Sequence, residues 1–374
     1  MSQKYPGGII SKTAPVTVGP VDGEGGSAPG VWTLTQALEL NKQGLWPKPV
    51  LPKELYSWGQ NTSAQLGLGD GVLRSSPVQV GTLTTWSQIA NGSTHTLATK
   101  ADGTLWSWGS SNQGQLGLND TVKRSSPVQV GSLTTWYQVA GGNRFTFATK
   151  TDGTLWGWGQ NTNGQLGLGD VVGRSSPVQI GALTTWHKIT SGSDFSLAIK
   201  TDGTLWSWGN NYYGNLGGND VVYRSSPVQI GSLTTWSQIA GGGGHGVAIK
   251  TDGTLWIWGG NQYGQLGLGD TVRRSSPVQV GALTAWSTIA AGRFHCIALK
   301  TDGTLWSWGF NPNGQLGHNN TTYLSSPVQV GALTAWYQVA GGRNHTLATK
   351  TDGTLWSWGR NATYGALGLG NAVN

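Results

Sequence analysis

Four histidines recur at one position of a repeating pattern and are the first candidates for chemistry. They are His95, His245, His295 and His345. Imidazoles arranged in a ring could bind a metal ion or act as general bases. Two other copies of the pattern carry Phe145 and Phe195 at the same position. A position that accepts a phenyl ring requires volume and not a lone pair, so we interpret these histidines as packing residues.

Aspartate and arginine also recur together, four residues apart, in five copies. The pairs are Asp70 and Arg74, Asp120 and Arg124, Asp170 and Arg174, Asp220 and Arg224, and Asp270 and Arg274. The sixth copy changes both residues at once, to Asn320 and Leu324. Joint loss is expected of an ion pair, because either charge left alone in a buried loop would be uncompensated. We therefore predict structural loop ion pairs, not catalytic acids or bases.

No set of residues assembles into a catalytic, cofactor or metal site. Each Ser and Asp is repeated, whereas one active site needs asymmetry. The glycine-rich segments such as GQLGLGD are not followed by the Lys-Ser/Thr of a nucleotide loop. The single Cys296 permits neither an intrachain disulfide nor a cysteine zinc site. Unrepeated carboxylates such as Glu39, Glu54 and Asp194 are scattered, so a glycan-acting enzyme, which needs a carboxylate pair, stays an alternative of low merit.

The elements that position these residues follow from a period of 50 residues. Each copy holds four short runs with strand character, which in the second copy are Leu105–Trp108, Pro127–Val130, Trp136–Ala140 and Phe145–Lys150. Pairs such as Asp102-Gly103 separate the fourth run from the next first run and suit tight turns. One four-stranded sheet cannot bury both of its faces alone, so neighbouring copies must stack. The sequence predicts an all-β fold, a β-propeller of four-stranded blades over residues 51–374.

The LWSWG, GQLGLGD, SSPVQVG and GxxHTLA segments resemble the regulator of chromosome condensation repeat family. The resemblance covers residues 51–374 and implies a seven-bladed propeller. It also implies that the chain could act as a guanine-nucleotide exchange factor on a small GTPase or bind chromatin. All full copies have the same length, so no blade carries an inserted segment that could act as a wedge and open the nucleotide site of a GTPase. We keep this function as the alternative.

Residues 1–50 lie mostly outside the repeat and are predicted to be an amino-terminal strap or anchor. The LWSWG run occurs seven times and the other runs six times. Ala14–Gly19, reading APVTVG, is therefore expected to supply the missing strand and close the ring. We favour a propeller of seven blades and keep six blades as the alternative. Thr33, Gln36 and Gly44 suit the start and end of one short helix.

Variation between copies is concentrated in residues 110–113, 121–123 and 141–144 of the second copy and their equivalents. Following the strands up and down places these three patches on one face of the ring, which we call the loop face. Aromatic and arginine side chains gather there in the later copies. This candidate sector consists of Tyr212, Tyr213, Tyr223, Tyr263, Arg293, Phe294, Phe310, Tyr323, Arg343 and Tyr364. Exposed rings suit binding of a protein or a sugar, although they could also pack among the loops themselves.

Charge and the first residues complete the functional interpretation. The net charge is +7, but no long basic run is present, so nucleic acid is not an expected partner. The start carries neither a signal peptide nor a transmembrane segment. YPGGII, GVWTL and GLWP resemble the leader of aquatic bacteriophage tail or fibre proteins. We therefore expect a noncatalytic virion protein of the tail, fibre or capsid decoration, assembled in the host cytoplasm. It would contact other virion proteins through residues 1–50 and a host-surface protein or glycan through the loop face.

Overall fold

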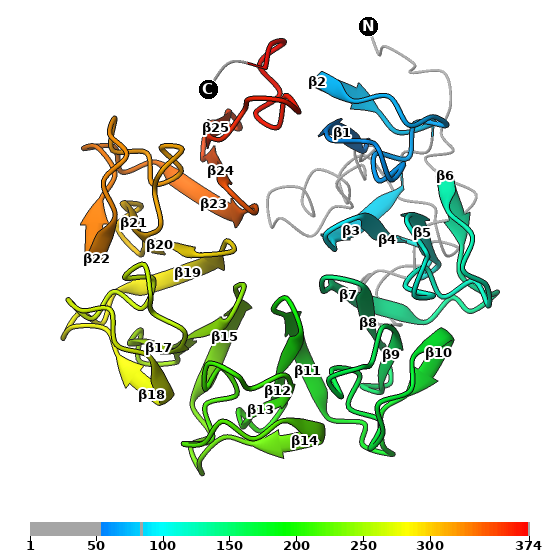
Figure 1. Ribbon diagram of the computed structural model, residues 1–374, viewed down its shortest axis with the longest axis horizontal. Coiled ribbons are helices and arrows are strands. Elements are labelled where there is room, and N and C mark those ends of the chain that lie inside the picture. The colour runs from blue at the N-terminus through cyan, green and yellow to red at the C-terminus, as the bar shows by residue number, and fades with distance from the viewer. Residues whose placement is uncertain (1–53, 83–84, 373–374) are drawn as a thin grey trace, which may run out of the picture. The chain divides into compact units, whose positions relative to one another are not determined.

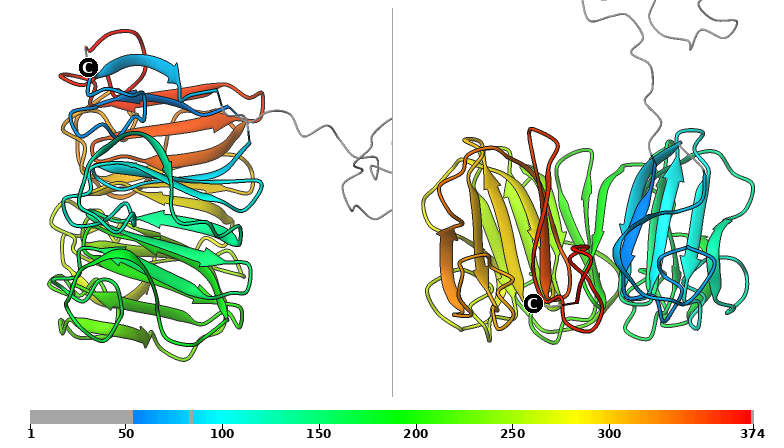
Figure 2. Two further views of the ribbon diagram at one scale, coloured as in Figure 1. Left: turned by 90° about the vertical axis from the view of Figure 1, so that its right-hand side faces the viewer. Right: turned by 90° about the horizontal axis from the view of Figure 1, so that it is seen from above.

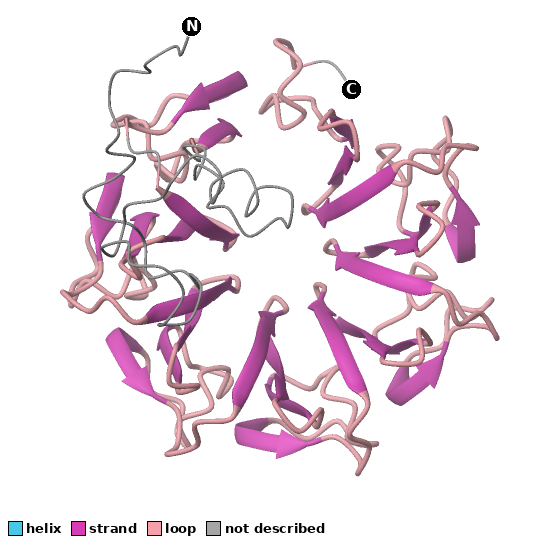
Figure 3. Ribbon diagram, turned by 180° about the vertical axis from the view of Figure 1, so that it is seen from behind, coloured by secondary structure: helices cyan, strands magenta, loops and turns pink. Residues whose placement is uncertain are grey.

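The computed structural model describes residues 54–82 and 85–372, which are strands joined by turns and loops. The sheets stand around a ring, with each sheet facing its neighbours (Figure 1). Figure 3 shows the same ring from behind, with strands and loops distinguished by colour. Within this part of the chain no helix is long and apolar enough to cross a membrane. The predicted strap, helix and closing strand in residues 1–50 lie outside the described residues.

Each complete sheet has four antiparallel strands in chain order. The first strands are β3 (Trp86–Asn91), β7 (Trp136–Gly141), β11 (Trp186–Ser191), β15 (Trp236–Gly241), β19 (Trp286–Ala291) and β23 (Trp336–Gly341). The second strands are β4 (His95–Lys100), β8 (Phe145–Lys150), β12 (Phe195–Lys200), β16 (His245–Lys250), β20 (His295–Lys300) and β24 (His345–Lys350). The first strands lie near the ring centre in Figure 1.

The third and fourth strands form the outer half of each sheet. The third strands are β1 (Tyr56–Gly59), β5 (Leu105–Gly109), β9 (Leu155–Gly159), β13 (Leu205–Gly209), β17 (Leu255–Gly259), β21 (Leu305–Gly309) and β25 (Leu355–Gly359). The fourth strands are β2 (Arg74–Gln79), β6 (Arg124–Gln129), β10 (Arg174–Gln179), β14 (Arg224–Gln229), β18 (Arg274–Gln279) and β22 (Leu324–Gln329). These fourth strands begin earlier than predicted, because Arg124 and its equivalents pair with the glycine that ends the third strand.

The number of blades corrects the sequence prediction. Five sheets have four strands, β23, β24 and β25 form a three-stranded sheet, and β1 and β2 form a two-stranded one. The described strands number 25, which is six sets of four and one strand more. These strands are distributed over seven sheets, but their number suffices for six complete four-stranded blades and not for the favoured seven. The reason is that the strands of a further blade would have to come from residues outside the described part, where the repeat pattern is lost.

Tryptophans explain why the repeat stacks so regularly. The second Trp of the five internal runs of the LWSWG type is buried between two sheets, and its indole N–H donates to a carbonyl of the preceding repeat, as Trp108 does to Gln65 O at 3.0 Å. The glycine of the preceding GQLG segment faces that indole: a Cβ on Gly117 would lie 2.7 Å from Trp158 Nε1. A bulky indole and a bare glycine are therefore complementary parts of one contact between sheets.

The turns of the opposite face are fixed by a second repeated arrangement. Asp152 Oδ1 accepts hydrogen bonds from the N–H and hydroxyl of Thr154, whose oxygen accepts the indole N–H of Trp156. The ammonium group of Lys150 lies 3.7 Å from the centroid of the Trp156 ring, a cation–π contact. All six TDGT or ADGT turns carry this arrangement. The recurrence of the turn sequence is thus explained by structure alone.

The recurrent histidines lie inside these sheet contacts. His95 is 1% exposed, and its Nε2 lies 2.9 Å from the hydroxyl oxygen of Thr146 in the next sheet. Burial lowers the pKa of His95 and His245 to about 4 and that of His295 to about 3. Phe145 fills the equivalent space in the following copy. Among the described residues no three His, Cys, Asp or Glu side chains lie close enough together to hold a metal ion.

Candidate partner-binding face

The hydrogen bonds between loops show which segments share a face of the ring. Residue 160, in the first variable patch, donates its N–H to the carbonyl of Arg144, in the third patch, at 2.9 Å. On the other side, Thr151 of the turn donates to the carbonyl of Thr135 in the GSLTT loop at 2.9 Å. Figure 2 shows the strands running between these two faces. The variable segments therefore lie together on the loop face, as expected.

Five loops on this face carry an ion pair between an aspartate and an arginine four residues apart. Arg74 Nη2 lies 2.6 Å from Asp70 Oδ2, and the four other predicted pairs form the same contact at 2.5 to 2.6 Å. The hydrogen bond from Arg74 holds the pKa of Asp70 below its usual range. The aspartates are between 34% and 39% exposed, so each pair is solvated and contributes little free energy. In the sixth copy Asn320 keeps the turn by accepting the N–H of Thr322.

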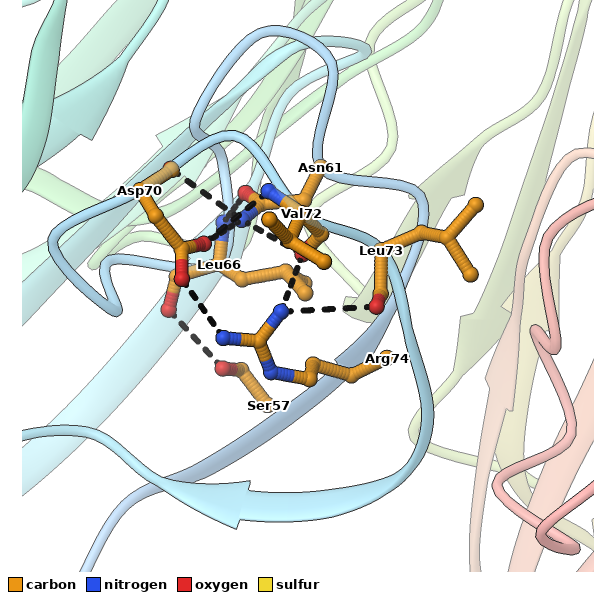
Figure 4. A network of polar contacts seen from close by, with 7 residues as sticks. All are labelled: Ser57, Asn61, Leu66, Asp70, Val72, Leu73 and Arg74. Carbon is orange, nitrogen blue, oxygen red and sulfur yellow. Dashed lines mark hydrogen bonds and ion pairs between the residues drawn. The ribbon is translucent and has the colours of Figure 1, made fainter.

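Asn61 is the centre of this loop, and we did not recognise it from the sequence. Its Nδ2 donates to Asp70 Oδ1 and to the carbonyls of Asp70 and Val72, and its Oδ1 accepts the N–H of Leu66 (Figure 4). The residue is fully buried. The same asparagine recurs in five further copies, with Ser111 in the remaining one. That recurrence was the available signal.

Four rings of the candidate sector form one cluster across two sheets, which we call the four-ring cluster. It consists of Tyr263, Phe294, Phe310 and Tyr323. The Tyr263 ring, from the loop after β17, lies 4.6 Å from the Phe310 ring, from the loop after β21, between centroids. The Arg293 guanidinium carbon lies 4.8 Å from the centroid of Phe294. These rings thus pack among the loops, while Tyr323 remains 45% exposed.

The neighbouring sheet presents its aromatic side chains differently. Tyr213 has the position of Tyr263 in the repeat, but it faces Gly244 and Gly260 where the next copy has Phe294 and Phe310. Tyr212 packs edge-on against Tyr213 at 4.8 Å and is 61% exposed. The Tyr223 hydroxyl accepts a hydrogen bond from Asn210 at 3.1 Å, and this side chain is 45% exposed.

The remaining two members of the candidate sector are separate. Arg343 is exposed and Tyr364 is half-buried, and within the described residues neither makes a ring contact with the four-ring cluster. The structure therefore groups eight of the ten predicted residues on consecutive loops. A surface of ordered rings with one stacked arginine is suited to protein recognition, since such side chains bury much area at small entropic cost.

Comparison with known protein families shows which family the chain belongs to. The sequence pattern described as "Regulator of chromosome condensation (RCC1) repeat" matches residues 54–99, 102–149, 152–199, 202–249, 252–299 and 302–349. The chain belongs to this RCC1 repeat family. A second RCC1 repeat pattern also matches six segments between residues 86 and 366. No curated protein matches the full sequence at a significant level.

Solved structures share the fold. Prp20, the yeast RCC1, in a crystal structure with Kap60, is 24% identical, with a TM-score of 0.76 over 86% of this chain and 81% of that one. A structure of Prp20p from Saccharomyces cerevisiae, reported with its binding to Gsp1p and histones, gives 24% identity and a TM-score of 0.77 over 86% and 84%. Human WBSCR16 gives 23% and 0.76 over 86% and 93%.

The expectation of a bacteriophage virion protein is wrong. The family match is to an RCC1 repeat and the yeast neighbour is an RCC1, and nothing in the comparisons indicates a virion protein. The error arose from three short segments within residues 1–50, a far smaller match than the six repeats. The family-based alternative, a propeller that resembles a guanine-nucleotide exchange factor or binds chromatin, agrees better with the comparisons.

Proposed function

We propose that this protein is a noncatalytic RCC1-type propeller that binds a folded protein partner through the candidate sector. The observation that carries the proposal is the four-ring cluster beside Tyr212 and Tyr223. The half-buried rings of Tyr263 and Phe310 pack against the exposed Tyr323, and Tyr213 packs against the exposed Tyr212, so binding would cost little entropy in ordering the exposed rings. Arg293, stacked on Phe294, adds donors for directed hydrogen bonds.

A small GTPase is the partner class that we propose first. Binding to Gsp1p and to histones is reported for the yeast Prp20p structure. A histone is strongly basic, and a chain with a net charge of +7 repels such a partner at long range. The repeats carry no inserted segment, so we propose binding through the side chains of the loop face itself. Release of labelled GDP from the GTPase distinguishes simple binding from nucleotide exchange.

The test compares the affinity of two variants for a purified small GTPase and for core histones. Replacing Tyr212 and Tyr323 by Ala should weaken GTPase binding about tenfold or more, because these are exposed anchors of the surface. Tyr337→Ala is the matched control. Tyr337 is also 61% exposed, but it follows Trp336 at the start of β23, close to the turns of the opposite face. Equal loss in both variants, or binding by neither the native protein nor the control, would refute the proposed surface.

A further inference from the structure

One repeat position differs in the blade that ends with β14. Gly218 stands where five other copies have leucine and one has His318. The leucines are Leu68, Leu118, Leu168, Leu268 and Leu369. Leu118, Leu168 and Leu268 pack against the apolar cores between sheets. Gly218 does not have a positive φ, and a Cβ built on it would meet nothing within 4 Å. The backbone therefore does not require glycine here.

The missing side chain opens a cavity between two neighbouring sheets. Its volume is about 460 Å³. The apolar lining includes Leu216, Val228, Ile230, Trp236, Trp256 and Pro277. Val228 is 42% exposed, whereas its equivalents are half-buried in the copies with Leu68, Leu118, Leu168 or Leu268. The sixth copy has His318 at this position, and there Val328 is likewise exposed, at 40%. A leucine at this position thus covers apolar surface that Gly218 leaves uncovered.

Arg224 at the edge of the cavity also differs from its counterparts. In four other copies Nη1 of the arginine donates to the carbonyl two residues earlier at 2.6 to 2.8 Å. Nη1 of Arg224 has instead only a 3.5 Å contact with the Tyr223 carbonyl, while Nη2 keeps the pair with Asp220 at 2.6 Å. One charged donor therefore remains available where the cavity opens. The adjacent Asp220 balances its charge, so a neutral acceptor suits it better than an anion.

We propose that this cavity binds a leucine side chain from the interior of a partner polypeptide, with a neighbouring main-chain carbonyl accepting a hydrogen bond from Arg224. The size and shape of the ligand follow from the other copies, where the chain's own leucine occupies the equivalent space. The apolar walls provide the free energy, and the single donor provides the orientation. This site is separate from the four-ring cluster and does not depend on the proposed function.

The test uses N-acetyl-L-leucinamide as the probe and the full-length protein labelled with ¹⁵N at tryptophan. The indole N–H signals of Trp236 and Trp256, assigned with Trp→Phe variants, should shift and saturate at millimolar probe. N-acetyl-L-alaninamide should bind at least about tenfold more weakly, because its methyl group buries much less apolar surface than an isobutyl group. Absence of a saturable shift with the leucine probe would overturn the proposal.

Two variants separate the cavity from the rest of the surface. Gly218→Leu restores the side chain of the other copies and should abolish the shifts while leaving the fold intact. Leu268→Gly should open the equivalent cavity in the next sheet and produce a new shift at Trp306. Unchanged binding by Gly218→Leu would overturn the proposal even if Leu268→Gly does not fold. Tighter binding of the anion N-acetyl-L-leucine than of the amide would show an aliphatic acid site and overturn the peptide assignment.

Discussion

Individual histidines couple the stability of the ring to pH. Burial lowers the pKa of His95 to about 4, against an ordinary value of 6.5 in the unfolded chain. Between these values the unfolded state binds more protons, so the stability present above pH 6.5 is lost as the pH falls towards 4. The corresponding loss is about 3 kcal/mol for this histidine. His245 and His295 contribute in the same direction.

His95→Phe should remove part of this acid sensitivity. Phe145 already occupies the equivalent site, where the next sheet's Ser196 keeps its bond to Gln165 O. In the variant Thr146 would likewise keep its bond to Gln115 O. The measurement is urea unfolding at pH 7 and pH 4.5. We expect a smaller difference between the two pH values than in the native protein. The exposed His187, changed to Gln, should leave that difference unaltered; an equal effect of both variants would exclude burial as the cause.

The loop on the partner-binding face behaves as one element around its buried asparagine. Asn161 is 1% exposed and bonds Asp170 O, Asp170 Oδ1, Val172 O and the N–H of Leu166. Asn161→Ala leaves several buried groups without partners and should lower the free energy of unfolding by about 3 kcal/mol. Chemical denaturation measures this change.

Asn161→Ser provides the control for that loop. Ser111 occupies the same position in the second copy, where its hydroxyl contacts the Asp120 carbonyl at 3.3 Å. The serine variant should therefore be destabilised less than the alanine variant. If the alanine and serine variants lose the same free energy of unfolding, the hydrogen bonds of the side chain do not stabilise the loop.

Features that depend on neighbouring residues could be predicted from the sequence, whereas contacts between sheets could not. The period of 50 residues predicted the strands, because alternating burial and turn chemistry act locally. The ion pairs were predictable because both partners lie in one loop. The four-ring cluster joins Tyr263 to residues of the next copy, and its packing depends on the rotation between sheets. The cavity at Gly218 was missed because it lies outside the variable patches and is seen only where two sheets meet.

At the scale of the whole molecule, the ends of the described chain determine how the ring closes. Residues 361–370 contact the first sheet: Trp58 Nε1 donates to Ala366 O at 3.1 Å, and Gly370 N donates to Ser75 O at 2.9 Å. A Cβ on Gly365 would lie 2.6 Å from Ser75 Cα. This is the same contact that joins the internal sheets, as Gly114 with Ser175 shows.

Gly365→Ala should therefore strain the closure of the ring. Gly314→Ala is a matched control, since Gly314 also has a positive φ, of 73° against 61°, but its Cβ would meet only Asn320 O at 4.0 Å. Both variants bear the backbone cost of alanine, of about 1 kcal/mol. The Gly365 variant should lose clearly more stability in thermal unfolding. Equal melting temperatures would mean that this contact does not limit the stability of the ring.

Among the described strands, the three-stranded sheet ends at β25, whereas the internal sheets have a fourth strand. Leu355 and Trp356 of β25 are 52% and 46% exposed, whereas Leu105 and Leu305 are fully buried. In the sequence, Val18 of the predicted closing strand Ala14–Gly19 aligns with Val130, which follows β6 and is 2% exposed.

Val18→Asp tests whether this strand covers that edge. If residues 14–19 form the fourth strand of this sheet, a carboxylate at the position equivalent to Val130 would be costly, and the variant should lose at least about 2 kcal/mol of stability. Thr17→Asp is the control, because Thr17 aligns with the half-exposed Gln129 of β6. Thermal unfolding and proteolysis near Trp356 provide the measurement. Protection of β25 in the native chain and its loss in the Val18 variant alone would assign the closing strand to residues 14–19. Identical behaviour of both variants would mean that the edge of β25 is covered by another segment or left open.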